Sequence, residues 1–211
     1  MFACLIAPGL TAGGCAALGV AAQALPEPDI QARYGNLHDH SVAPLVWVPR
    51  GLEVDYPSLR LDLVASIQSQ LQRAQAAGVK DLKGATFPHA AASLVRFQQD
   101  HPELERTPIV TVAPRLGVQR VIYIEVENFQ TRSDQAVDLY RGSATISLRV
   151  VEVENAQAKL AYEEPKLTVT YPPSAPPEGM PGVGDAKIYR GTVDLLATGI
   201  ATRFYAHPSG K

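Results

Sequence analysis

The residues best suited to bind a metal lie together at His38-Asp39-His40. In an extended chain, His38 and His40 would share a face, so two imidazole nitrogens could hold a metal ion with a third ligand. The surrounding segment, however, is polar and has little periodicity, which is typical of a solvated linker. We therefore expect no metal and no cofactor. The other histidines stand singly at expected helix ends, where histidine is ordinary: His89, His101 and His207.

A second candidate is a pair of carboxylates on one apolar segment. Glu125 and Glu127 are two residues apart and would share a strand face, where they could be imagined as a general acid and base. Tyr123 shares that face, while two isoleucines and a valine occupy the other. This alternation is typical of a strand with one dry and one solvated face. We therefore expect the two glutamates to face solvent.

Motifs for nucleotide binding and for serine hydrolysis are incomplete. The run GMPGVG at 179–184 is superficially similar to a phosphate-binding loop, but no Lys-Ser/Thr pair follows it. The chain also has no Gly-x-Ser-x-Gly elbow. Trp47 and Tyr123 are expected in or near the core. The sequence thus predicts no catalytic residue and no enzyme. The alternative is a small enzyme or ligand binder whose cleft gathers Glu125, Glu127 and a histidine.

One cysteine has the setting of a lipid attachment site. Ala12-Gly13-Gly14-Cys15 resembles a lipobox, in which the thiol accepts the lipid and small residues fit the processing peptidase. The first 24 residues carry no charge. We therefore expect a signal peptide over 1–15 and lipid attachment at Cys15, which anchors the protein to a membrane without spanning it. The alternatives are an ordinary signal peptide cut near Ala22 or Ala24, or a cytosolic extension.

Composition limits the class of protein further. The chain has 211 residues, of which 46% are hydrophobic, enough for the core of one domain. The net charge is -2, and the basic residues are spread along the chain, so we expect no nucleic-acid partner. Beyond Cys15 there is no cysteine, so no disulfide is expected in the domain.

These residues must be positioned by elements that the apolar pattern predicts. Residues 16–43 are expected to be a flexible tether. The elements that follow are a strand over 44–49, a helix from Pro57 to Gly78, a short strand over 79–84, a helix over 88–101, a helix over 107–117 that conflicts with Pro114, strands over 118–129, 139–153 and 159–171, a mobile Pro/Gly-rich loop over 172–184, and a helix from Asp185 to about Phe204.

This order predicts a single α+β domain over 44–208. Its sheet would be mixed but mostly antiparallel, with about four strands and with helices packed on it. The last three strands would be antiparallel neighbours, with the first central or inserted beside them. Gly191 and Gly199 in the last helix are explained if that helix packs close to the sheet.

The order of elements resembles an envelope-lipoprotein group. It includes the TolB amino-terminal domain, the curli secretion protein CsgG and the lipoprotein activators of penicillin-binding proteins. The resemblance is carried by the lipobox-like Cys15 with its tether and the strand LVWVP, by the segments Ala113–Phe129 and Tyr140–Glu164, and by the final ATRFYAH.

The resemblance implies a non-enzymatic role in the bacterial envelope. The protein would be lipid-anchored on the periplasmic side, at the outer membrane, and would contact an envelope protein as an activator, an assembly factor or a secretion accessory.

Overall fold

A computed structural model describes residues 29–133 and 138–209 of the chain. The residues from Gln31 to His207 form one compact unit. The expected signal peptide, the expected lipid attachment residue Cys15 and the first part of the expected tether lie outside the described residues. None of the helices in the described part has the length and apolar character needed to span a bilayer.

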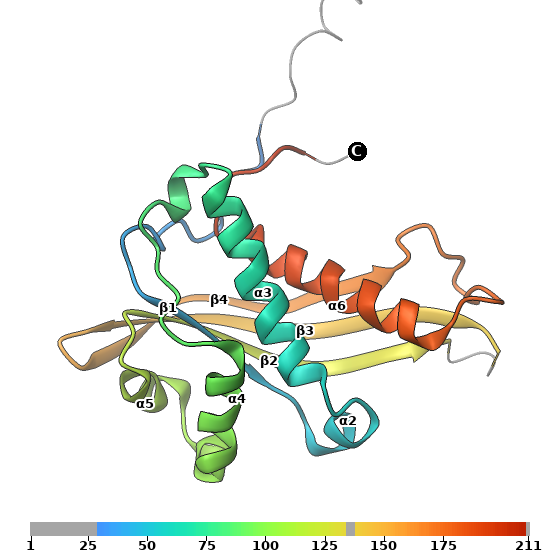
Figure 1. Ribbon diagram of the computed structural model, residues 1–211, viewed down its shortest axis with the longest axis horizontal. Helices are drawn as coiled ribbons and strands as arrows, with labels where there is room; N and C mark the ends of the chain where they lie inside the picture. The colour runs from blue at the N-terminus through green and yellow to red at the C-terminus, as the bar shows by residue number, and fades with distance from the viewer. Residues whose placement is uncertain (1–28, 134–137, 210–211) are drawn as a thin grey trace, which may run out of the picture. The chain divides into compact units, whose positions relative to one another are not determined.

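The centre of the unit is a four-stranded sheet in the order β1-β2-β3-β4 (Figure 1). β1 runs parallel to β2, and the other neighbouring pairs are antiparallel. The predicted mixed, mostly antiparallel sheet is therefore confirmed, with the first strand at one edge. The strands are β1 (Val42–Trp47), β2 (Arg120–Arg132), β3 (Tyr140–Glu154) and β4 (Gln157–Tyr171).

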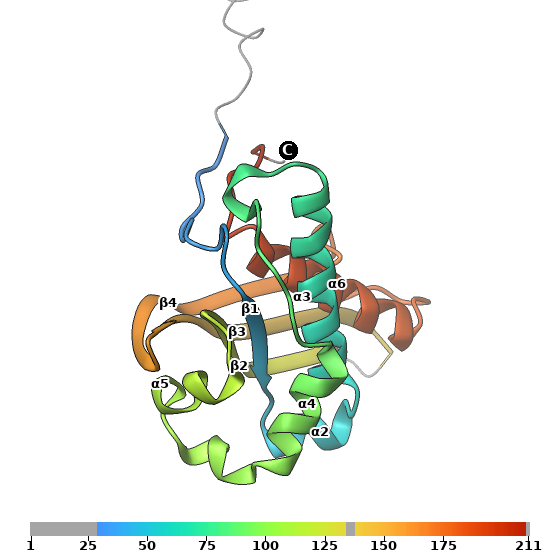
Figure 2. The same ribbon diagram turned by 60° about the vertical axis from the view of Figure 1, so that its left-hand side comes forward.

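Helices pack on both sides of this sheet. α3 and α6 lie next to each other on one face, whereas α5 lies on the other side of the sheet and α4 beside β1 (Figures 1 and 2). The helices are α2 (Arg50–Asp55), α3 (Leu59–Ala76), α4 (Ala91–Asp100), α5 (Ile109–Val112) and α6 (Asp185–Ala201), with short 3₁₀ helices η1 (Lys80–Leu82), η2 (Pro102–Arg106) and η3 (Ala113–Leu116).

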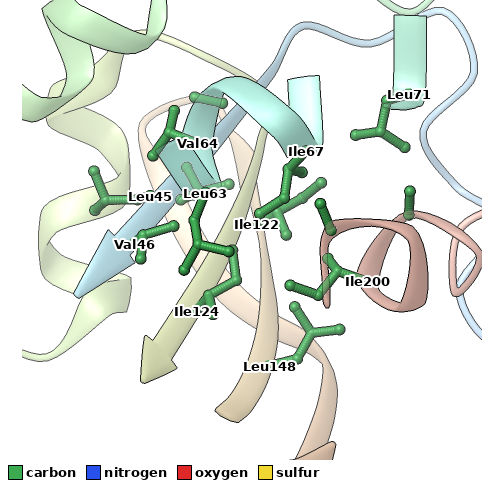
Figure 3. Close-up of a cluster of buried hydrophobic side chains, with 14 of the residues drawn as sticks. Leu45, Val46, Leu63, Val64, Ile67, Leu71, Ile122, Ile124, Leu148 and Ile200 are labelled. Carbon is green, nitrogen blue, oxygen red and sulfur yellow. The ribbon is translucent and has the colours of Figure 1, made fainter. Parts of the chain in front are cut away.

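The main core lies between the sheet and the layer of α3 and α6 (Figure 3). In β2, Ile122 and Ile124 are two residues apart and therefore point to the same face, where both are fully buried. Leu63 and Ile67 repeat every four residues on α3, so they form a stripe that covers this face. Ile200 of α6 completes the cluster (Figure 3). The sequence pattern predicted these inward faces correctly.

The structure corrects two local predictions. The segment 79–84 is not a strand but contains η1, which is closed by backbone hydrogen bonds from Leu82 to Val79 and from Lys83 to Lys80. Gln75 Nε2 donates to the carbonyls of Leu82 (3.0 Å) and Ala85 (2.7 Å). The conflict at Pro114 is resolved by a shorter helix: α5 ends at Val112 and continues as η3, which has the proline in its first turn.

The expected boundary of the tether at Ala43 is also wrong. Tyr34 and Leu37 are buried in the core, with 8% and 0% of their surface exposed. The backbone amides of Arg33 and Tyr34 donate to the carbonyl of Arg203 at 2.8 and 3.0 Å. Burial of two large side chains offsets the loss of chain entropy, so this stretch belongs to the domain.

The loop over 172–184 follows its residue types, whereas the hairpin turn between β3 and β4 places an alanine in the left-handed region. Residues 172–184 have no helix or strand, as predicted, but Met180 pairs with Tyr140 through two backbone hydrogen bonds of 3.0 Å. The middle of the loop is therefore hydrogen-bonded to the first residue of β3. Between β3 and β4, Asn155 and Ala156 have φ of 51° and 62°, which makes a two-residue hairpin of type I′.

Candidate functional site

The His38-Asp39-His40 cluster is part of a packed turn and not of a linker. The Asp39 amide donates to the carbonyl of Lys83 at 2.8 Å. His40 Nδ1 lies 2.5 Å from the carbonyl oxygen of His38, and Arg120 Nη2 lies 2.9 Å from His40 Nε2. His40 therefore donates at Nδ1 and accepts at Nε2. Within residues 29–133 and 138–209, no three metal-ligating side chains gather.

A buried charge network, which the sequence did not reveal, holds the segment before β1. The carboxylate of Glu152 accepts hydrogen bonds from Tyr34 Oη (2.8 Å), Asn36 Nδ2 (3.1 Å) and Lys159 Nζ (3.0 Å). Burial alone would raise the pKa of Glu152. The hydrogen bonds and the charge of Arg120 outweigh burial, so the pKa falls to about 2. This network joins the segment before β1 to β3 and β4.

Polar side chains gather on the sheet face opposite α3 and α6. The strand register places Trp47, Glu125 and Ser147 in one cross-strand row. The next row contains Tyr123 of β2, Arg149 of β3 and Glu163 of β4. Alternation along each strand puts both rows on the same face, away from the main core. We call this set of six residues the polar sheet face.

Arg149 is the centre of the polar sheet face. Its Nε atom lies 2.8 Å from Glu163 Oε1, and its Nη1 atom lies 3.2 Å from Glu125 Oε2. The hydrogen bond to Glu163 raises the pKa of Arg149, burial opposes this rise, and the charge of Glu125 adds to it. The three side chains are 29–46% exposed, so water screens the pairs and they add little stability.

The two glutamates that the sequence singled out, Glu125 and Glu127, have different surroundings. Glu125 is bonded to Arg149 and also accepts a hydrogen bond from Ser147 Oγ at 3.2 Å. Glu127 is exposed where a β-bulge shifts the register between Val126 and Asn128. None of the contacts described for Glu125 joins it to a histidine.

A small cavity adjoins the polar sheet face at its β1 edge. Its volume is about 20 Å³, and Trp47, Arg60, Gln98, His101 and Tyr123 are among the residues that line it. Burial, together with the charge of Glu125 and a hydrogen bond to it, raises the pKa of Tyr123. At pH 7 the phenol of Tyr123 is therefore protonated and can donate a hydrogen bond.

A larger groove of about 550 Å³ runs between α3 and α6. Hydrogen bonds between the two helices cross it. Tyr189 Oη donates to Asp62 Oδ2 at 2.7 Å, and lies 3.0 Å from Ser58 Oγ. Burial is the main cause that raises the pKa of Tyr189, and the hydrogen bond to Asp62 adds to it. These bonds fasten the helices to each other and explain the polar lining.

Sequence reasoning located only part of this site. It placed Glu125, Glu127 and Tyr123 on one strand face, and Trp47 near the core. It missed Arg149 and Glu163, whose positions depend on the register of three strands. The alternation along β3 could have indicated the position of Arg149. Its neighbours Leu148 and Val150 are fully buried on one face of the strand, so Arg149 lies on the other face.

Comparisons with known proteins give only distant similarities. No family model matches the chain, and no curated protein matches it significantly. Similar solved structures include the hypothetical protein CT253 of Chlamydia trachomatis, with 21% identity and TM-score 0.35, over 62% of this chain and 71% of that one. Lipoprotein GNA1162 of Neisseria meningitidis has 16% identity and TM-score 0.36, over 62% and 79%.

A third similar structure is a PelC dodecamer from Paraburkholderia phytofirmans. It has 11% identity and TM-score 0.36, over 84% of this chain and 95% of that one. One of these three proteins is named a lipoprotein.

Proposed function

We propose that the protein is an exported, lipid-anchored component of the bacterial envelope that acts by binding a partner protein and catalyses no reaction. The lipobox-like sequence before Cys15 supports the anchor. The observation that carries the binding role is the polar sheet face, which groups Trp47, Tyr123 and Arg149 on three adjacent strands.

The residue types on this face suit a protein contact. Tryptophan, tyrosine and arginine are the types most enriched among residues that dominate binding energy. Trp47 and Tyr123 are partly exposed, so each combines a packed body with a surface that a partner can reach. All three sit on strands, which hold their positions better than loops do.

The charge of the surface indicates the chemistry of the partner. Glu125 and Glu163 share the single positive charge of Arg149, and Glu127 is exposed nearby on β2. The negative charges exceed the positive one, so the complementary partner surface carries lysine or arginine. We therefore expect binding to weaken as salt is raised.

In-cell photocrosslinking tests this proposal. A benzophenone amino acid replaces Thr168, an exposed residue that pairs with Thr145 on the same sheet face. The control position is Gln72, which is exposed on α3. Irradiation should give one discrete protein adduct from position 168 and none from position 72. The absence of an adduct at 168, or the same adducts from both positions, would contradict the proposal.

A further inference from the structure

Three buried polar atoms without a hydrogen-bond partner belong to residues that line one cavity. They are Trp47 Nε1, Arg60 Nε and Gln98 Oε1, and no bond to any of them occurs in the part of the chain that the structure describes. Buried polar groups in folded proteins are almost always hydrogen-bonded, because an unmade bond loses the full cost of removing the group from water. Their occurrence around one cavity therefore indicates a common partner.

The chemistry of the three atoms defines what this partner must be. Trp47 Nε1 and Arg60 Nε carry hydrogens and can only donate. Gln98 must present its oxygen, because its Nε2 atom donates to the carbonyl of Val46 at 3.0 Å. The partner must therefore accept two hydrogen bonds and donate at least one.

The charge around the cavity selects a neutral group. The guanidinium of Arg60, whose side chain is 9% exposed, is already paired through Nη2 with the carboxylate of Glu53. An anion would meet the oxygen of Gln98 and the nearby carboxylate of Glu105, which also lines the cavity. A cation would meet the two donors. The partner of the three atoms must therefore be a neutral group that both donates and accepts hydrogen bonds.

The size of the cavity decides between neutral groups. A water molecule needs at least roughly 10–15 Å³ of space for its centre, and this cavity offers about 20 Å³. A carboxamide or an alcohol with its carbon atoms needs considerably more. We infer that the cavity binds one fixed water molecule, which accepts from Trp47 Nε1 and Arg60 Nε and donates to Gln98 Oε1.

This water connects three elements, two of which, β1 and α4, are also joined by the hydrogen bond from Gln98 to Val46. Trp47 is the last residue of β1, Arg60 lies in the first turn of α3, and Gln98 lies in the last turn of α4. The water therefore holds the indole of Trp47 in one orientation beside the polar sheet face. The inference does not depend on the proposed partner role, since it concerns the protein alone.

Trp47 is the only tryptophan of the chain, so its indole N–H gives a single, assignable NMR signal. In the full-length protein, we expect a cross-peak between this signal and water whose sign marks a long-lived water molecule. The Gln98→Leu variant, which removes the acceptor, should lose the cross-peak. Gln68→Leu is the matched control, because Gln68 is buried and, like Gln98, donates to a backbone carbonyl, that of His89 at 2.8 Å. It should keep the cross-peak.

A cross-peak of the sign given by rapidly exchanging water in the wild type would overturn the inference, as would its loss in both variants when both are folded. Should Gln98→Leu fail to fold, a high-resolution crystal structure of the wild type decides. The inference expects electron density for one water within hydrogen-bond distance of the three atoms. A dry cavity, or an ion in place of the water, would overturn it.

Discussion

The hydroxyl of Tyr34 donates a hydrogen bond of 2.8 Å to the carboxylate of Glu152, although the two residues are 118 positions apart in the chain. Tyr34 lies in a segment whose sequence is typical of a tether, and Glu152 lies near the end of β3. The bond therefore fixes the start of the domain at the sheet. It also makes the stability of the domain depend on the ionisation of one carboxylate.

The first prediction concerns this pH dependence. The folded-state pKa of Glu152 is about 2, below its ordinary value of 4.5. Because this pKa is lowered on folding, the contribution of Glu152 to stability is present above pH 4.5 and is lost as the pH falls toward 2. Urea unfolding between pH 6 and pH 2 should show this loss. The variant Glu152→Gln should be less stable at pH 6 and depend less on pH.

The control for this prediction is Glu178→Gln, which neutralises an exposed carboxylate of the loop. It should keep the pH dependence of the wild type. Some dependence should remain in Glu152→Gln as well. Burial alone would raise the pKa of Glu164, but the hydrogen bonds from Arg203 and Tyr162 and the charges of Arg203 and Arg33 together outweigh burial and lower this pKa too. An equal slope in the wild type and Glu152→Gln would contradict the charge network.

The second prediction concerns the main core. Ile124 is fully buried between β2 and the helical layer. Ile124→Ala should lower the free energy of unfolding by roughly 2–5 kcal/mol, because it removes buried apolar surface and leaves a cavity. Val54 is 80% exposed, so Val54→Ala should change it by no more than ~0.5 kcal/mol. Chemical denaturation measures both, and similar losses would mean that the faces of β2 are assigned wrongly.

The third prediction compares two glycines of α6. A Cβ atom at Gly191 would overlap the ring of Tyr171, whereas one at Gly199 would make an ordinary contact with Val169 at 3.8 Å. Gly191→Ala should therefore destabilise the protein by about 1–3 kcal/mol, despite the better helix propensity of alanine. Gly199→Ala should be neutral or stabilise by up to ~1 kcal/mol.

Thermal unfolding of both glycine variants checks the close approach of α6 to β4. The sequence predicted close packing at both positions, but the structure has it only at Gly191. If Gly191→Ala were as stable as Gly199→Ala, the helix would lie farther from β4 than described.

The fourth prediction concerns the anchor. If Cys15 carries the lipid, Cys15→Ser should move the protein from the membrane fraction to the soluble or unprocessed pool. Cys4→Ser changes a cysteine within the expected signal peptide and should leave fractionation unchanged. Mass spectrometry of the mature N-terminus shows directly whether Cys15 carries a lipid. An unlipidated wild-type protein would refute the anchor.

The parts of the fold that were predictable are those governed by local periodicity. The alternation around Ile122 and Ile124, and the four-residue repeat of Leu63 and Ile67, indicated which faces are buried. The α+β class followed from the order of these elements. Gly117, with φ of 63°, ends η3 at the place where the sequence has a helix stop.

The parts that were not predictable depend on contacts between distant residues. Tyr34 and Leu37 give no periodic pattern, so their burial became visible only with the sheet in place. The polar sheet face depends on the register that brings Arg149 between Glu125 and Glu163. The cavity at Trp47 needs one residue from each of three elements, and no local pattern marks such a set.

The most direct test of the proposed binding role is the effect of charge reversal on crosslinking from position 168. Glu163→Lys should reduce the adduct by roughly thirty-fold, because it sets a positive charge against the lysine or arginine of the partner. Glu178→Lys makes the same charge change at an exposed position of the loop 172–184 and should leave the yield unchanged. Unfolding temperatures confirm that both variants are folded. An undiminished adduct in folded Glu163→Lys would contradict binding through the polar sheet face.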